Sequence, residues 1–175
     1  LDTAISIIRS EGNSYIILMG HSTGGLITLL YINDKQSPHI KGLILNSPFL
    51  DMNMSSFMEN IIVPFGSFGG GLFPRISIKR DKSTFYAHSL LKDFKGEWNF
   101  NTDWKKPEGH PQRLGWVRAI HKGHKKVQKG LSIQCPILVM SSDKSIQPDN
   151  EWNNNYLSAD IVLDVHDIQK YGAKL

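Results

Sequence analysis

The sequence is poor in cysteine and has no long apolar run. Its 175 residues include one cysteine, Cys135, which excludes an internal disulfide framework and favours a reducing compartment. No stretch reaches the roughly 18 to 20 apolar residues that a bilayer span needs, and the first residues lack the basic-then-apolar order of a secretory signal. We therefore expect a soluble, cytoplasmic chain.

Charge is distributed unevenly along the chain. Between Arg75 and Lys129 there are 14 Lys and Arg against 5 Asp and Glu, whereas the rest holds 6 against 11. This basic segment predicts either a solvated helix face or a surface for weak contact with an anionic membrane. Its aromatic residues do not alternate with basic ones in a stacking pattern, so we expect no binding of nucleic acid.

Short apolar strands alternate with helices. The pattern predicts a helix over residues 1–10, buried strands at Tyr15–Met19, Ile40–Asn46 and Pro136–Ser141, and a helix over Leu26–Ile32. The first strand is apolar on both faces. The predicted fold class is therefore α/β, with a mostly parallel sheet covered by helices on both faces.

About 90 residues separate the second and third strands, far more than a crossover helix needs. We expect a core part at 1–50, an inserted cap or lid region at 51–131, and a second core part with the acid loop at 132–175. Within the insertion, 61–74 is apolar but broken by Gly and Pro, which predicts a mobile loop, and 111–131 predicts a helix.

The stretch Gly20 to Gly25, "GHSTGG", contains a G-x-S-x-G motif between a strand and a helix. A turn this sharp forces Ser22 into a strained backbone conformation and exposes its hydroxyl at the carboxyl edge of the sheet. We expect side chains at Gly20 and Gly24 to collide with neighbouring backbone. The Thr23 amide would face the position of a developing oxyanion, which makes Ser22 a candidate nucleophile.

The segments "IILMGHSTGG", "IKGLILNSPFLD" and "IQCPILVMSSD" together resemble an α/β-hydrolase of the serine aminopeptidase and monoglyceride lipase or lysophospholipase type. The resemblance implies a Ser-Asp-His triad in that chain order, with the insertion as a cap. It also implies a serine hydrolase that cleaves acylglycerol-like or lysophospholipid-like esters through an acyl-enzyme on Ser22. An inactive hydrolase-fold binding module, a peptidase and an acyltransferase remain alternatives. We expect no cofactor and no metal.

The acid of the triad has two candidates. In the family that the sequence resembles, the acid lies in a loop after the strand that corresponds to "PILVMSS", commonly in a small-small-Asp-x-x-x-Asp setting. Asp143 follows that strand directly, whereas Asp160 in "SADIVLD" matches the setting better. We favour Asp160 and expect Asp164 to begin or cap the next helix.

The expected base is missing from its place. The family pattern puts the histidine one strand beyond the acid, and none of the seven histidines lies there. His166 is nearest in sequence, but it falls in a predicted helix that leads away from the acid. No strand before Tyr15 supplies a second oxyanion amide. We therefore expect these 175 residues to be the central part of a longer hydrolase.

Two further sets of side chains could line the site. Phe65, Phe68 and Phe73 could form a lid that faces substrate, or they could be ordinary core residues. His121 and His124 have i, i+3 spacing on a helix, but two such ligands without a carboxylate favour a packed or groove-facing pair over a metal site. The expected partner is a small ester or lipid-like substrate.

Overall fold

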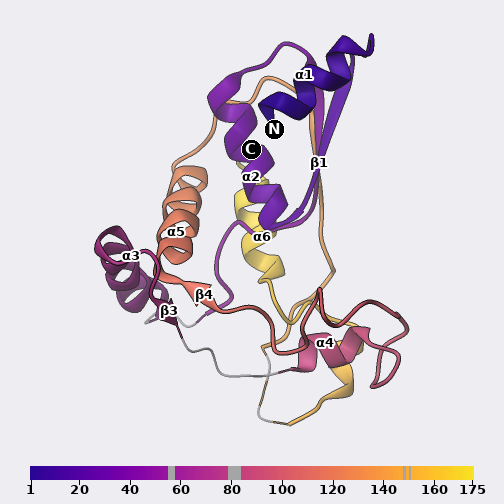
Figure 1. Ribbon diagram of the computed structural model, residues 1–175, viewed down its shortest axis with the longest axis vertical. Coiled ribbons are helices and arrows are strands. Elements are labelled where there is room, and N and C mark those ends of the chain that lie inside the picture. The colour runs from indigo at the N-terminus through magenta and orange to yellow at the C-terminus, as the bar shows by residue number, and fades with distance from the viewer. Residues whose placement is uncertain (55–57, 79–83, 148, 150) are drawn as a thin grey trace. The chain divides into compact units, whose positions relative to one another are not determined.

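The computed structural model describes residues 1–54, 58–78, 84–147, 149 and 151–175 (Figure 1). Strands and helices alternate in the first 50 residues, as the sequence predicts. The helices are α1 (Asp2–Ser10), α2 (Thr23–Lys35), η1 (Met58–Ile62), α3 (Val63–Leu72), α4 (Phe85–Leu90), α5 (Leu114–Gln128), η2 (Asn154–Leu157) and α6 (Val165–Gly172). The strands are β1 (Ile16–Ser22), β2 (Ile40–Pro48), β3 (Ser77–Ile78), β4 (Gln112–Arg113) and β5 (Ile137–Met140).

The chain forms two compact units. The first holds Leu1–Asp51, Gly123–Ser141 and Asp167–Leu175, and the second holds Met52–Lys122 and Ser142–His166. In this grouping the end of α5 belongs to the first unit and the segment after β5 belongs to the second, and the division into core parts and a cap stays a prediction. Helix α5 therefore contributes residues to both units.

A parallel sheet of order β1-β2-β5 forms the centre of the first unit. Strand β1 pairs with β2 from Ile16 opposite Ile40, and β2 pairs with β5 from Leu43 opposite Ile137. The described part of the sheet thus confirms the predicted strands and their parallel order. Since all three strands run the same way, the end of β1 at Ser22 lies at the carboxyl edge of the sheet.

The two faces of this sheet differ. One face is covered by α2 and by the end of α6, where Gly172 approaches the Val139 side chain, and Leu45 on this face is fully buried. On the other face Ile17, Met19 and Leu138 are 52%, 60% and 54% exposed. The prediction that the first strand is buried on both faces is therefore wrong for the described residues, since the helices that pack on the sheet cover one side only.

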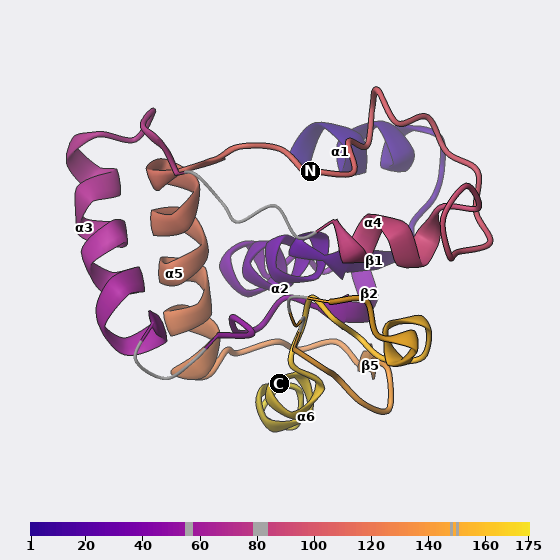
Figure 2. The same ribbon diagram turned by 90° about the horizontal axis from the view of Figure 1, so that it is seen from below.

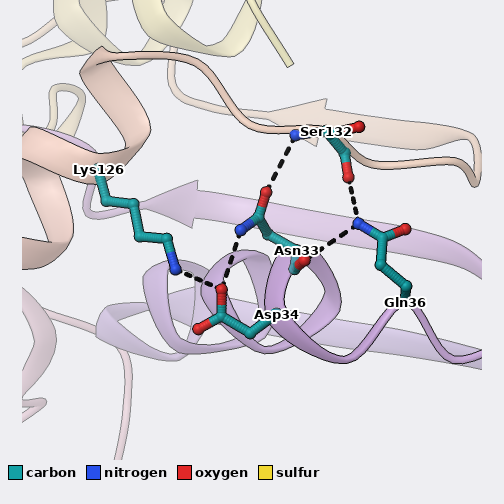
Figure 3. Close-up of polar contacts among 5 residues, drawn as sticks. All are labelled: Asn33, Asp34, Gln36, Lys126 and Ser132. Carbon is teal, nitrogen blue, oxygen red and sulfur yellow. Dashed lines mark hydrogen bonds and ion pairs between the residues drawn. The ribbon is translucent and has the colours of Figure 1, made fainter.

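Polar contacts fix the C-terminal end of α2 within the first unit (Figure 3). The Asn33 side chain accepts a hydrogen bond from the Ser132 amide at 3.0 Å, and the Gln36 amide group donates to the Ser132 carbonyl. Lys126 of α5 forms an ion pair with Asp34, which holds the pKa of that carboxyl below its usual range. These contacts tie the helix that follows Ser22 to the chain that leads into β5.

In the second unit, α3 packs against the first half of α5, and the two helices lie side by side in both views (Figures 1 and 2). A Cβ at Gly70 would lie 2.3 Å from the Leu114 carbonyl oxygen, so glycine allows this close approach. The Arg118 guanidinium donates to the Ser67 carbonyl at 3.0 Å. The predicted mobile loop at 61–74 is therefore wrong: close packing of its glycines against α5 supports a helix.

Aromatic side chains connect α4 to the segment that follows β5. The Phe85 ring stacks on Tyr156 with centroids 5.5 Å apart, and Trp152 meets Tyr156 edge-on at the same distance. The buried Tyr156 hydroxyl accepts a hydrogen bond from the Asp149 amide at 2.7 Å. This cluster anchors the loop that carries both candidate acids.

Candidate active site

Ser22 has the strained backbone that the sequence predicts. Its φ is 51° and its ψ is −121°, a backbone conformation that residues other than glycine rarely adopt. It ends β1, and α2 begins at the next residue. The strand thus changes into a helix within one residue, which is the geometry of a nucleophile elbow.

Two glycines allow this turn, but they are not the predicted pair. A Cβ at Gly20 would lie 2.5 Å from Thr28 Oγ1 and 2.6 Å from the Gly24 carbonyl oxygen. A Cβ at Gly25 would lie 2.8 Å from the Pro48 Cβ, whereas one at Gly24 would meet nothing within 4 Å. The prediction is correct for Gly20 and wrong for Gly24, because Gly25 is the helix position that faces β2.

Strand β2 supports the elbow from the side. The Phe49 amide donates to the Ser22 carbonyl at 3.0 Å, and Pro48 lies opposite Ser22 in the sheet register. The His21 side chain is hydrogen-bonded through Nδ1 to the Asn46 carbonyl at 3.0 Å. The His21 side chain therefore connects the end of β1 to the neighbouring strand β2, which agrees with a structural role beside the serine.

Thr23 is the first residue of α2, a helix of 13 residues. Amides in the first turn of a helix have no acceptor within that helix and point back along its axis, where the helix dipole adds partial positive charge. The Thr23 amide belongs to this first turn, directly after Ser22, and its role as an oxyanion donor stays a prediction.

Asp160 has a fixed carboxylate. Its Oδ1 accepts hydrogen bonds from the Val162 and Leu163 amides, both at 2.8 Å. Its backbone forms a parallel bridge with Ser145, in which the Asp160 amide donates to the Lys144 carbonyl at 3.0 Å and the Ile146 amide donates to the Asp160 carbonyl at 2.9 Å. One carboxylate oxygen is thus held by the loop, and the other receives no hydrogen bond from a described residue.

Asp143 lies on the adjoining backbone segment but is held differently. It is exposed, and no described residue donates a hydrogen bond to its carboxylate. Because Lys144 pairs with Asp160, the two candidate acids lie on neighbouring segments of one loop cluster. Asp164 precedes α6 and its side chain accepts the His166 amide at 2.9 Å, so it caps the helix as predicted.

In the part of the chain that the structure describes, no histidine is hydrogen-bonded to Ser22, Asp143 or Asp160. His124 is buried, with Nε2 2.9 Å from the Phe49 carbonyl oxygen and its ring edge-on to Phe49. His166 is exposed near the start of α6. These contacts leave the base of a triad unassigned among the described residues.

The three predicted lid phenylalanines lie on or just after α3. Phe65, Phe68 and Phe73 are 73%, 70% and 59% exposed. Their large exposure argues against a role as ordinary core residues.

Among the described residues, no three His, Cys, Asp or Glu side chains are grouped so that they could hold a metal ion. None of the described helices combines the length and apolar content needed to cross a bilayer.

Residues 1–151 match the family model for serine aminopeptidases, S33. The chain belongs to this family. The match includes the elbow and Asp143, and it ends before Asp160. No curated protein sequence matches this member of the S33 family.

Two solved structures share the fold of this S33 family member. One is a monoacylglycerol lipase from Paleococcus ferrophilus, with a TM-score of 0.67 and 18% identity over 99% of this chain and 59% of that one. The other is a soluble variant of monoglyceride lipase from Saccharomyces cerevisiae in complex with a substrate analogue, with a TM-score of 0.62 and 17% identity over 97% of this chain and 52% of that one. The chain thus has a partial α/β-hydrolase fold and spans 52 to 59% of these lengths.

Sequence reasoning missed Ser145. Its hydroxyl accepts a hydrogen bond from the Val165 amide at 3.1 Å, and its backbone neighbours pair with Asp160. In sequence it is one of several polar residues in "SSDKSI", and no spacing distinguishes it. The only available signal is its position shortly after β5, where loops carry functional groups in α/β folds.

Proposed function

We propose that the whole protein is a serine hydrolase that cleaves carboxylic esters through an acyl-enzyme on Ser22. The observation that carries the proposal is the backbone of Ser22, strained at φ 51° between a strand and a helix in a member of the S33 family. Such strain persists at a cost of about 1 to 3 kcal/mol and concentrates at functional sites.

In the proposed reaction, Ser22 Oγ attacks the ester carbonyl carbon while a histidine base takes its proton. The Thr23 amide stabilises the oxyanion, to which one such donor contributes on the order of 3 kcal/mol. The alcohol leaves with the proton, and water then releases the acyl group as an acid. We propose that the base and the second oxyanion donor come from parts of the whole protein outside these 175 residues.

We propose Asp160 as the acid that orients this histidine. Its Oδ1 is fixed by two amides, and this arrangement leaves the second oxygen for an imidazole. Asp143 has no comparable support among the described residues. The contacts therefore favour Asp160 over Asp143.

The proposed substrate carries an apolar acyl chain, as in acylglycerols or lysophospholipids. Support comes from the exposed rings of Phe65, Phe68 and Phe73, and from the two lipases that share the fold. A surface of this kind gains free energy when it covers an alkyl chain, about 0.8 kcal/mol for each buried CH₂. Weak contact of the basic segment with anionic membranes and a cytoplasmic location stay predictions.

The test is labelling and hydrolysis by the whole protein. A fluorophosphonate probe should label Ser22, and p-nitrophenyl esters should be hydrolysed faster as the acyl chain lengthens from acetate to octanoate. The Ser22→Ala variant is the control for both measurements. A protein that neither reacts with the probe nor hydrolyses any ester is a binding module, and the proposal is then wrong.

The family model favours a second candidate, an aminopeptidase that uses the same elbow. Aminoacyl p-nitroanilides distinguish the two activities. Higher kcat/KM on these amides than on esters of matched size would assign the protein to peptide chemistry, and acyl transfer to an added alcohol would assign it to the acyltransferases.

A further inference from the structure

The segment from Asp160 to Val165 is held at both ends by one residue. At its start, the bonds from Asp160 to Lys144 and from Ile146 to Asp160 flank Ser145 on either side, at 3.0 and 2.9 Å. At its end, the Val165 amide donates to the Ser145 hydroxyl at 3.1 Å. Ser145 therefore contacts both the candidate acid and the first residue of α6.

Between these two ends the segment has little freedom. Asp160 Oδ1 closes a turn over the Val162 and Leu163 amides, and the side chains of Ile161, Leu163 and Val165 are all buried. Because the same oxygen binds amides on the way to Val165, a shift of the Val165 end should also move the carboxylate. The Ser145 hydroxyl is the side-chain contact that fixes this end.

We infer that Ser145 is a positioning residue for the proposed acid. By accepting the Val165 amide it sets where the segment 160–165 ends, and so it sets the direction of the Asp160 carboxylate. The inference rests on the proposed function of Asp160. It assigns Ser145 no contact with substrate, so loss of the hydroxyl should slow the chemical step and leave substrate binding unchanged.

The test compares single variants of the whole protein on one ester substrate. Ser145→Ala should lower kcat on the order of 10-fold, as expected for a slightly misplaced catalytic group, with KM unchanged. The rate of fluorophosphonate labelling should fall with kcat. Ser158→Ala is the matched control: its exposed serine lies two residues before Asp160, and its hydroxyl donates only to the Asn155 carbonyl at 3.4 Å. It should behave as the parent protein.

A second pair of variants separates the hydroxyl from packing. Ser145→Thr keeps a hydroxyl acceptor, and Ser145→Val has nearly the volume of threonine without that acceptor. Ser145→Thr should therefore retain most of kcat, and Ser145→Val should match Ser145→Ala. Equal activity of Thr and Val, or of Ser145→Ala and Ser158→Ala, overturns the inference. Asp160→Asn tests the proposed function separately: if Asp160→Asn stays fully active, Asp160 is not the acid, and both this assignment and the inference about Ser145 are wrong. If it is inactive while Ser145→Ala is normal, the inference alone is wrong.

Discussion

Ser22 and Asp160 are held in place by different means. Ser22 takes its position from regular elements, since β1 ends and α2 begins there. Asp160 lies in a loop without regular strands and is held by hydrogen bonds to its own neighbours and to the segment around Ser145. The elbow is therefore set by regular elements, including the neighbouring strand β2 through Phe49, whereas the loop of Asp160 depends on its own turn and on a segment about fifteen positions away.

Removing the proposed nucleophile should have the largest effect. Ser22→Ala removes the attacking hydroxyl, and loss of a triad serine costs on the order of 10⁶-fold in kcat. Steady-state hydrolysis and fluorophosphonate labelling measure the loss. If probe labelling persisted in Ser22→Ala, the elbow would not carry the nucleophile.

Asp160→Asn should have the next largest effect, a fall of about 10⁴-fold in kcat, because an amide cannot stabilise the histidine cation as a carboxylate does. The asparagine Oδ1 can still accept the Val162 and Leu163 amides, so the fold should be retained. Asp143→Asn is the matched control and should keep nearly full activity. A reversed order of the two losses would assign the acid to Asp143.

Glycine variants test whether the elbow depends on close packing of β1 against α2. Gly20→Ala puts a methyl group within 2.6 Å of two neighbouring oxygen atoms, and overpacking of this kind lowers the free energy of unfolding by about 1 to 3 kcal/mol. Gly24→Ala has open space and should not destabilise the protein. Thermal unfolding of the two variants side by side measures the difference. Equal melting temperatures would contradict the close approach of β1 and α2.

The smallest expected effect concerns strain at Ser22 itself. Ser22→Gly should unfold at a higher temperature than Ser22→Ala, because glycine adopts a positive φ without strain and the backbone of Ser22 costs about 1 kcal/mol or more. Both variants lack the proposed nucleophile, so the difference between their melting temperatures reports the backbone strain. Calorimetry measures it. A lower melting temperature for the glycine variant would mean that the elbow is not strained.

The elbow could be predicted because its signal is local. An apolar strand, a serine between small residues and an uncharged helix follow one another within about twenty residues, and each imposes its own geometry. The three parallel strands follow from the same kind of pattern. Local patterns therefore suffice for the part of the core that carries Ser22.

The rest depends on partners that are distant in sequence. The glycines at 66 and 70 read as loop residues until Leu114 and Arg118 are placed against them, and Ser145 has no signal until Val165 donates to it. The exposure of Ile17 likewise depends on which helices cover the sheet. Each of these outcomes is set by tertiary contacts that override local propensity.

The exposed face of the described sheet bears on the solubility of this polypeptide. Met19, Ile44 and Leu138 lie side by side across β1, β2 and β5, and in the described sheet β1 and β5 are edge strands. Apolar edge strands are templates for pairing between molecules. A polypeptide of these 175 residues made alone should therefore precipitate at a lower concentration than a protein whose sheet is covered on both faces. A charged residue at position 19 should raise its solubility limit.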